Sequence, residues 1–86
     1  MIELKNIDLS KVSIREQFKK VIEEHEELID ALDGLYKTED TKEHVIEEYW
    51  DVVQAWLGVL DKYGINADEV MEGYSKHLKK LEHRPR

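Results

Sequence analysis

The chain has 86 residues, which is enough for one small domain with a modest core, and we interpret residues 1–86 as a single domain. Its net charge of −7 disfavours nucleic-acid binding, because that depends on neutralising phosphates with Lys and Arg. It contains no Cys and no apolar run near the ~20 residues of a membrane span, so we expect a cytoplasmic protein with neither disulfides nor a membrane partner.

The composition is that of a helical protein. One Pro and four Gly interrupt the 86 residues. Three capping-box patterns mark helix starts: Ser13-x-x-Glu16, Asp40-x-x-Glu43 and Asn66-x-x-Glu69. Gly34 and Gly64 are typical of helix stops. We therefore predict helices at about residues 14–35, 41–63 and 67–82, preceded by an N-terminal arm at residues 1–12.

The first predicted helix carries an apolar stripe in helical register, formed by Ile14, Phe18, Val21, Ile22, Leu28, Ile29, Leu32 and Leu35. His25 falls within this stripe. We interpret it as a buried or interfacial imidazole with a hydrogen-bond partner, and a catalytic role is the alternative.

The second predicted helix is apolar over about half of its circumference, at Val45, Ile46, Tyr49, Trp50, Val52, Val53, Trp56, Leu57, Val59, Leu60 and Tyr63. Packing against one neighbouring helix needs less than that. The surplus, which includes Trp50 and Trp56, predicts contact with a second subunit rather than stacking on a nucleotide base. We predict an all-α fold of antiparallel helices whose four-helix-bundle core is completed by homo-oligomerisation, as a homodimer or a dimer of dimers.

One acidic pattern is written twice, as EEHEELIDAL at 23–32 and as EEYWDVVQAW at 47–56. Aligned without a gap, the two stretches share Glu-Glu at the start, an acid at the fifth place and Ala at the ninth, which are Ala31 and Ala55. Small side chains at these places would let the two helices approach each other closely.

The acids of the repeat fall on shared helix faces. Residues three apart point the same way, so Glu24 lies with Glu27, and Glu48 lies with Asp51. Four carboxylates brought together in partial shelter from water would repel one another. A divalent cation removes that repulsion, and Mg²⁺ prefers carboxylate oxygens. The repeat is then interpreted as two half-sites for metal.

Spacing alone leaves a second interpretation open. Glu-x-x-Glu is frequent on solvated helices, this chain is 38% charged, and Glu23-x-x-Glu26 is a further instance of the same spacing. Two matched pairs with the same flanking residues favour a metal site, but spacing does not decide between the two interpretations.

Charge is unevenly distributed along the chain. Residues 76–86 hold five Lys or Arg and one Glu, a local charge of +4, which leaves −11 on the first 75 residues. A basic end beside an acidic body could face an anion, or it could simply complement the helix dipole. Asn66 is interpreted as a helix N-cap rather than a base reader. His44, on the Glu48 flank, is interpreted as a surface residue, with an approach to phosphates as the alternative.

Taken together, these residues resemble the MazG-like all-α nucleoside triphosphate pyrophosphohydrolases, whose relatives include phosphoribosyl-ATP pyrophosphohydrolase and the dimeric all-α dUTPases. The family pattern is Glu-x-x-Glu, about twenty residues, then Glu-x-x-Asp. Here the first pair stands in EEHEEL, twenty residues follow Glu27, and the second pair stands in EEYWDVV. The stretch GINADEVMEGYSKHLKKLEHR resembles the family's Gly-Ile-Asp loop and basic final helix, so the resemblance covers roughly residues 14–84.

This resemblance implies a Mg²⁺-dependent enzyme, with Mn²⁺ as a substitute, that hydrolyses a nucleoside triphosphate between the α and β phosphates. The products would be a monophosphate and pyrophosphate. It implies that Glu24, Glu27, Glu48 and Asp51 bind the metal and form the catalytic site. One of these carboxylates would accept the proton of the attacking water. No residue in the pattern selects a particular nucleotide.

The basic end departs from the family's Lys-x-x-Lys-Asn-x-x-Arg run. Lys76 and Lys79 match it, and the resemblance implies that they contact phosphates. Lys80 stands where Asn is expected, and Arg84 comes one residue late, so the implied phosphate contact does not extend to Arg84.

Two other classes of protein share features with this sequence. A non-catalytic helical dimerisation or regulatory module with the same fold stays open, and binding of Mg²⁺ or Mn²⁺ would count against it. A ferritin-like di-iron bundle needs Glu-x-x-His pairs. The residues three before His25, His44, His77 and His83 are Ile22, Thr41, Tyr74 and Lys80, so this class is excluded.

Overall fold

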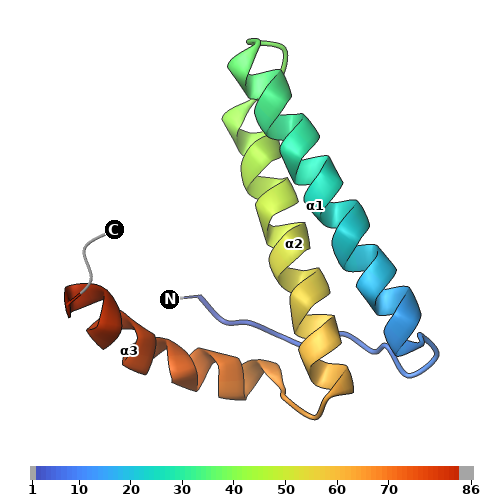
Figure 1. Ribbon diagram of the computed structural model, residues 1–86, viewed down its shortest axis with the longest axis vertical. Helices are drawn as coiled ribbons and strands as arrows, with labels where there is room; N and C mark the ends of the chain where they lie inside the picture. Colours follow the sequence, from blue (N-terminus) through green and yellow to red (C-terminus); the bar gives the residue numbers. More distant parts are fainter. Residues whose placement is uncertain (1, 84–86) are drawn as a thin grey trace.

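Three helices account for all the regular secondary structure in the computed structural model, which describes residues 2–83 (Figure 1). They are α1 (Ile14–Tyr36), α2 (Lys42–Lys62) and α3 (Ala67–His83). The predicted all-α class is confirmed, and each predicted helix boundary lies within one residue of the observed one. No helix in this part of the chain is long and apolar enough to cross a membrane.

Two of the three predicted caps are confirmed. Ser13 Oγ accepts a hydrogen bond from the Glu16 N–H at 3.1 Å. Asn66 and Glu69 cap each other, since each side chain accepts from the other's backbone N–H, at 3.0 and 3.2 Å. Such reciprocal bonds satisfy donors that a helix start leaves unpaired.

The predicted cap at Asp40 is wrong by one residue. Thr41 is the N-cap of α2, and its Oγ1 accepts from the His44 N–H at 3.2 Å. Asp40 instead accepts from the Thr41 N–H at 2.7 Å and contacts the His44 ring. The carboxylate is therefore held by neighbouring groups and is not free to cap the helix.

Gly64 ends α2 as predicted, with a φ of 81° that an L side chain rarely adopts. The predicted stop at Gly34 is wrong, because α1 continues through it to Tyr36 and the left-handed residue is Thr38, with a φ of 61°. Gly34 serves a different purpose. A Cβ there would lie 3.1 Å from the Asp40 Cβ, so glycine lets the connection fold closely over the end of α1.

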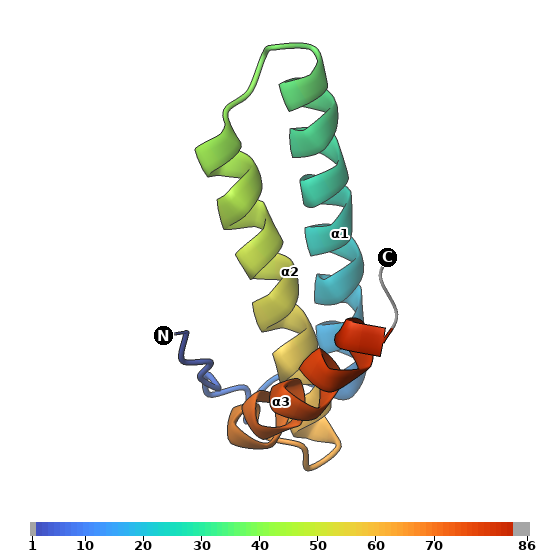
Figure 2. The same ribbon diagram turned by 90° about the vertical axis from the view of Figure 1, so that its left-hand side faces the viewer.

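α1 and α2 pack side by side as an antiparallel hairpin (Figures 1 and 2). The residues that are buried or half-buried between them recur every three or four positions, at Gln17, Val21, Glu24, Leu28 and Ala31 on α1 and at Glu48, Val52, Ala55 and Val59 on α2. We call this set the inner seam. Ala31 and Ala55 are only 2% and 5% exposed, as expected for small residues that let two helices approach.

A second row of apolar residues runs beside the inner seam and stays largely exposed. We call it the outer seam, and it consists of Phe18, Ile22, His25, Ile29 and Leu32 on α1, of Ile46, Tyr49, Val53, Trp56 and Leu60 on α2, and of Tyr63 at the C-cap of α2. Trp56 Nε1 donates a hydrogen bond to His25 Nε2 at 2.9 Å across this row. The predicted hydrogen-bond partner of His25 is thus confirmed, although the imidazole is exposed in the single chain.

α3 leaves the base of the hairpin and runs away from it (Figure 1). The radius of gyration is 15.0 Å, against about 12 Å for a compact chain of this length. Tyr74, Leu78 and Leu81 are exposed on α3. A single chain therefore leaves both the outer seam and α3 without the cover that amphipathic helices normally find.

The N-terminal arm, residues 2–12, crosses the base of the hairpin toward α3 (Figure 1). Four hydrogen bonds tie it to α2 and α3: Gln54 Nε2 to Lys5 O at 2.9 Å, Lys62 Nζ to Leu9 O at 2.6 Å, Ala67 N–H to Asn6 Oδ1 at 3.0 Å, and Leu4 N–H to Met71 Sδ at 3.1 Å. Gly58 allows the arm and α1 to approach α2, since a Cβ there would lie 2.7 Å from Leu9 Cδ1 and 2.5 Å from Gln17 Nε2.

Candidate metal centre

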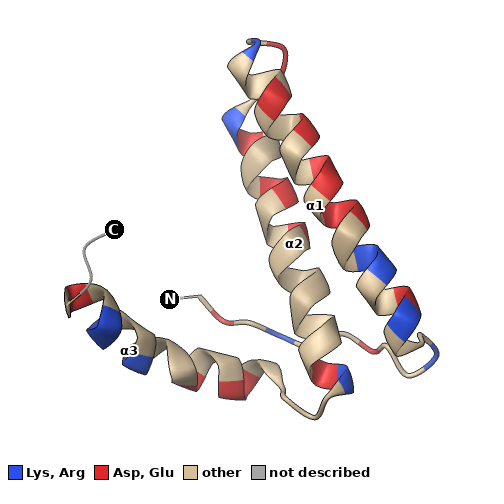
Figure 3. Cartoon of the chain, viewed as in Figure 1, with Lys and Arg blue, Asp and Glu red and all other residues tan. Residues whose placement is uncertain are grey.

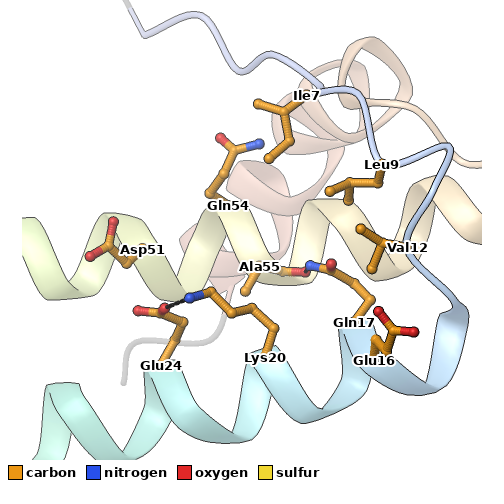
Figure 4. Close-up of a pocket in the computed structure, with 10 residues that line it drawn as sticks. All are labelled: Ile7, Leu9, Val12, Glu16, Gln17, Lys20, Glu24, Asp51, Gln54 and Ala55. Carbon is orange, nitrogen blue, oxygen red and sulfur yellow. Dashed lines mark hydrogen bonds and ion pairs between the residues drawn. The ribbon is translucent and has the colours of Figure 1, made fainter.

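Three of the four predicted acids meet between α1 and α2. Carboxylate oxygens of Glu24, Glu27 and Glu48 all lie within 4.8 Å of one another. Asp51 lies one turn beyond Glu48, outside this cluster, and it lines a cavity together with Glu24 (Figure 4). The arrangement follows from the sequence, because each pair has helical i, i+3 spacing and the antiparallel hairpin sets the two pairs face to face.

Glu24 is the most sheltered of these acids, with 5% of its surface exposed. Glu48 is half-buried and Glu27 is exposed. The Oε2 atoms of Glu24 and Glu48 are buried and have no hydrogen-bond partner within residues 2–83. Leaving a buried carboxylate oxygen unpaired is costly, so these two atoms fit a cation as their partner.

The other oxygen of each buried acid is held from outside the cluster. Lys20 Nζ contacts Glu24 Oε1 at 2.8 Å, and the hydrogen bond and charge of Glu24 raise the pKa of Lys20. Sequence reasoning missed Lys20. The i, i+4 spacing of Lys20 and Glu24 on one helix is the signal that could have identified it.

His44 contacts Glu48 as Lys20 contacts Glu24. Its Nδ1 lies 2.8 Å from the Asp40 carboxylate, and its Nε2 lies 3.1 Å from Glu48 Oε1. The hydrogen bond with Asp40 is the main cause that raises the pKa of His44, and Glu48 adds to it. A protonated ring donates to both carboxylates. His44 is therefore a surface residue, as predicted, that also orients a candidate metal ligand.

Mutual repulsion in the cluster is visible in the acids at its edge. The charge of Glu24 is the main cause that raises the pKa of Glu27, followed by desolvation and the charge of Glu48. Burial is the main cause that raises the pKa of Asp51, and the charges of Glu24 and Glu48 add to it. The shift of the Glu27 pKa thus reflects mainly the nearby negative charge, and the shift of the Asp51 pKa reflects mainly desolvation.

The predicted phosphate contacts, Lys76 and Lys79, lie elsewhere in the single chain. They line a separate hollow on α3 together with Glu69 and Glu72. Figure 3 shows the basic residues of α3 at a distance from the acidic hairpin. One chain therefore does not bring these lysines to the carboxylates, and their role stays a prediction. Arg84 lies outside the described residues.

The two predicted interface tryptophans are both 41% exposed. Trp50 packs edge-to-face on Tyr49, with ring centroids 5.7 Å apart. Trp56 packs edge-to-face on His25, with centroids 6.1 Å apart. Neither tryptophan lines the cavity beside Glu24 and Asp51, so the structure gives no support to base stacking on them.

An antiparallel helix pair with a carboxylate cluster in its seam and a second, exposed apolar row is typical of an all-α bundle protein that binds a divalent cation through oxygen ligands. A family model described as phosphoribosyl-ATP pyrophosphohydrolase matches residues 4–77, and the chain belongs to this family. It is thus a pyrophosphohydrolase acting on a phosphoanhydride bond, and the resemblance to the MazG-like enzymes is confirmed.

The matched residues begin in the N-terminal arm and include all four acids and Lys76, and they end before Lys79. Comparisons with curated proteins and with solved structures gave no match. The family assignment therefore rests on the family model, and the site geometry described above is consistent with it.

Proposed function

We propose that this chain is a Mg²⁺-dependent nucleotide pyrophosphohydrolase that cleaves its substrate between the α and β phosphates, giving a monophosphate and pyrophosphate. The observation that carries the proposal is the carboxylate cluster with its two buried, unpartnered oxygens in a member of this family. The family's name makes phosphoribosyl-ATP the first substrate to test, and the common nucleoside triphosphates come next.

Glu24, Glu27 and Glu48 would hold the metal, with Asp51 joining them from the side of the cavity. Bound there, Mg²⁺ would neutralise phosphate charge and activate water for attack at phosphorus. Mn²⁺ can take its place, because both ions accept carboxylate oxygens. Lys20 and His44 keep the two buried carboxylates in position from outside the cluster.

The working form would be a homodimer, or a dimer of dimers, in which the outer seams of two hairpins pack together. Four helices would then share one core, as in other bundles. The spacing of the outer seam and its exposed aromatic residues support this assembly. A second copy is also the means by which Lys76 and Lys79 could come close to the phosphates, since one chain keeps them apart from the acids.

Product analysis tests the reaction. The full chain is incubated with phosphoribosyl-ATP, and separately with each common nucleoside triphosphate, with and without Mg²⁺. We expect Mg²⁺-dependent release of pyrophosphate and a monophosphate. Orthophosphate as the primary product would contradict the proposal, and no turnover of any nucleotide would point to the non-catalytic module instead.

Substitution of the acids tests the site. Glu24→Gln and Glu48→Gln keep the side-chain shape but remove a metal ligand, and we expect each to lower kcat/KM more than about 100-fold. Loss of an outer partner of a metal ligand already costs about 10–100-fold. Glu23→Gln and Glu26→Gln are matched controls, because they carry the same spacing on the exposed part of α1. Equal loss in all four variants would mean that the effect is not specific to the cluster.

A further inference from the structure

A cavity of about 520 Å³ lies between the N-terminal arm, α1 and α2. It is lined by Ile7, Leu9 and Val12 of the arm, by Glu16, Gln17, Lys20 and Glu24 of α1, and by Asp51, Gln54 and Ala55 of α2 (Figure 4). Its volume is in the range of ~300–1,000 Å³ that is typical of small-molecule sites. It shares Glu24 with the carboxylate cluster and is also lined by Asp51, so the cavity adjoins the cluster.

The cavity has two chemically different ends. Glu24, Asp51 and the Lys20 ammonium gather at one end, and Ile7, Leu9 and Val12 form the other (Figure 4). The three arm residues at this end are uncharged, and the charged side chain nearest to them in the lining is Glu16 of α1, which lies beside Val12 (Figure 4). An occupant that fits this gradient carries its charge at one end and a flat or apolar body at the other.

Two amide side chains interrupt the apolar wall, and both are held in place. Gln17 Nε2 donates to the Ala55 carbonyl at 2.9 Å, and Gln54 Nε2 donates to the Lys5 carbonyl at 2.9 Å. Gln17 is only 5% exposed. Small-molecule sites commonly combine mostly apolar walls with a few such fixed polar groups, which orient the ligand.

The N-terminal arm forms one wall of this cavity, and hydrogen bonds hold its backbone in place. The bonds from Gln54 to Lys5 and from Lys62 to Leu9 fix the backbone on both sides of Ile7. Gly58 removes the side chain that would otherwise push Leu9 away from α2. The part of the arm that lines the cavity therefore has a defined position relative to Glu24 and Asp51.

We propose that this cavity binds the nucleoside part of the substrate, with the base and ribose against the arm and the phosphates toward the carboxylate cluster. The inference rests on the proposed function, and it adds a binding site and an orientation that the metal cluster does not specify. A nucleotide has the polarity that the cavity requires, because its phosphates occupy one end and a planar base with apolar faces occupies the other. The reverse orientation would place phosphates against Ile7, Leu9 and Val12 and near the Glu16 carboxylate, where no residue that lines the cavity supplies a positive charge.

A pair of arm variants tests this assignment by calorimetry with α,β-methylene-ATP and Mg²⁺, an analogue that cannot be cleaved between those phosphates. Ile7→Asp places a charge in the wall of the cavity, and Ile2→Asp places the same charge on the arm outside it. The two isoleucines are 55% and 65% exposed, so neither change disturbs a core. We expect Ile7→Asp to weaken nucleotide binding at least about 10-fold, which corresponds to about 1.4 kcal/mol, and Ile2→Asp to leave it unchanged.

Binding of Mg²⁺ alone, measured in the same way, should be equal in both variants and in the unsubstituted chain, because neither residue belongs to the carboxylate cluster. A second measurement needs no variant. In methyl NMR spectra of the unsubstituted chain, α,β-methylene-ATP with Mg²⁺ should shift the signals of Ile7, Leu9 and Val12 and should leave those of Ile2 in place.

The outcomes separate the two proposals. If the nucleotide binds with Mg²⁺ but Ile7→Asp behaves like Ile2→Asp and the arm methyl signals stay in place, the nucleoside site is wrong and the proposed function stands. If the unsubstituted chain binds no nucleotide with Mg²⁺, both proposals are overturned. If Ile7→Asp weakens Mg²⁺ binding as much as nucleotide binding, its effect arises at the metal, and the nucleoside site is again wrong.

Discussion

The α1–α2 hairpin and α3 are built from the same kind of amphipathic sequence, yet only the hairpin finds its partner within the chain. Ala31 and Ala55 narrow the inner seam, so the hairpin closes around Glu24 and Glu48. α3 is capped as well as α1 is, but its apolar row at Tyr74, Leu78 and Leu81 is exposed. Caps determine where a helix begins, whereas stable packing requires a complementary surface. The difference supports the proposed assembly, in which a second copy would cover α3 and the outer seam.

The largest effect should come from changing the outer seam. Trp56→Glu removes an apolar ring and places a charge where a second hairpin would pack, so we expect the assembly to dissociate to single chains of 10.2 kDa. Sedimentation measures the mass, and circular dichroism checks that the helices persist.

Trp56→Phe is the matched control for this prediction. It keeps an apolar ring and loses only the indole N–H that reaches His25, so the assembly should be retained. A folded Trp56→Glu protein with the mass of the unsubstituted assembly would mean that the outer seam is not the contact between copies.

The same comparison explains what the sequence could predict. Helix boundaries followed from local signals such as Ser13 and the reciprocal Asn66–Glu69 pair, and the acid cluster followed from i, i+3 spacing on two adjacent helices. Both depend on residues close in sequence or on one helix–helix contact. The cap at Thr41 was missed because Asp40 and Thr41 are both residues that N-caps favour. The structure distinguishes them, because the His44 N–H donates to Thr41 while the His44 ring contacts Asp40.

The arm could not be predicted in the same way. Its contacts join residues far apart in sequence, as between Lys5 and Gln54 or Asn6 and Ala67, and it has no periodicity that would indicate them. The cavity, which needs the arm as a wall, was therefore missed as well. Lys20 was missed for a different reason, because a Lys four residues before a Glu is common on any solvated helix.

Two glycines, one in each region, give the next prediction. Gly58→Ala places a methyl group against Gln17 and Leu9 in the hairpin. Displacing buried Gln17 from the Ala55 carbonyl costs about 1–3 kcal/mol, which offsets or exceeds the gain of about 1 kcal/mol in helix propensity. We expect a net loss of up to about 2 kcal/mol in the free energy of unfolding, measured by denaturant titration. A gain in stability would mean that the arm and α1 do not approach α2 as closely as the structure shows.

Gly73→Ala is the counterpart on α3. A Cβ there would meet nothing within 4 Å in the single chain, so only the helix propensity changes. We expect a gain of about 0.5–1 kcal/mol in α3 stability, visible as slower amide exchange in residues 67–83. Slower exchange without any change in assembly would confirm that this face of α3 is open. Loss of the assembly would instead place Gly73 at a contact between copies.

The smallest effect concerns pH in the metal-free protein. The charge of Glu24 raises the pKa of Glu27 above its usual 4.5, so the folded state binds a proton that the unfolded state has already released. Stability from this group is therefore fully present below pH 4.5 and is lost as pH rises through the raised pKa. The raised pKa of Asp51 adds a stabilising contribution of the same sign. That contribution is fully present below pH 3.8, the usual pKa of an Asp, and is lost at higher pH. The effect is small because Glu27 is exposed to solvent.

Glu27→Gln should flatten the pH dependence of thermal unfolding between pH 4.5 and 6.5, below the range in which His44, with its own raised pKa, loses its proton. Mg²⁺ at pH 7 should stabilise the unsubstituted chain more than this variant, because the metal relieves the same repulsion that a proton relieves. Glu72→Gln on α3 is the control, and it should change neither measurement. An equal response to Mg²⁺ in all three proteins would mean that the cation acts on the overall negative charge of −7 rather than on the cluster of Glu24, Glu27 and Glu48.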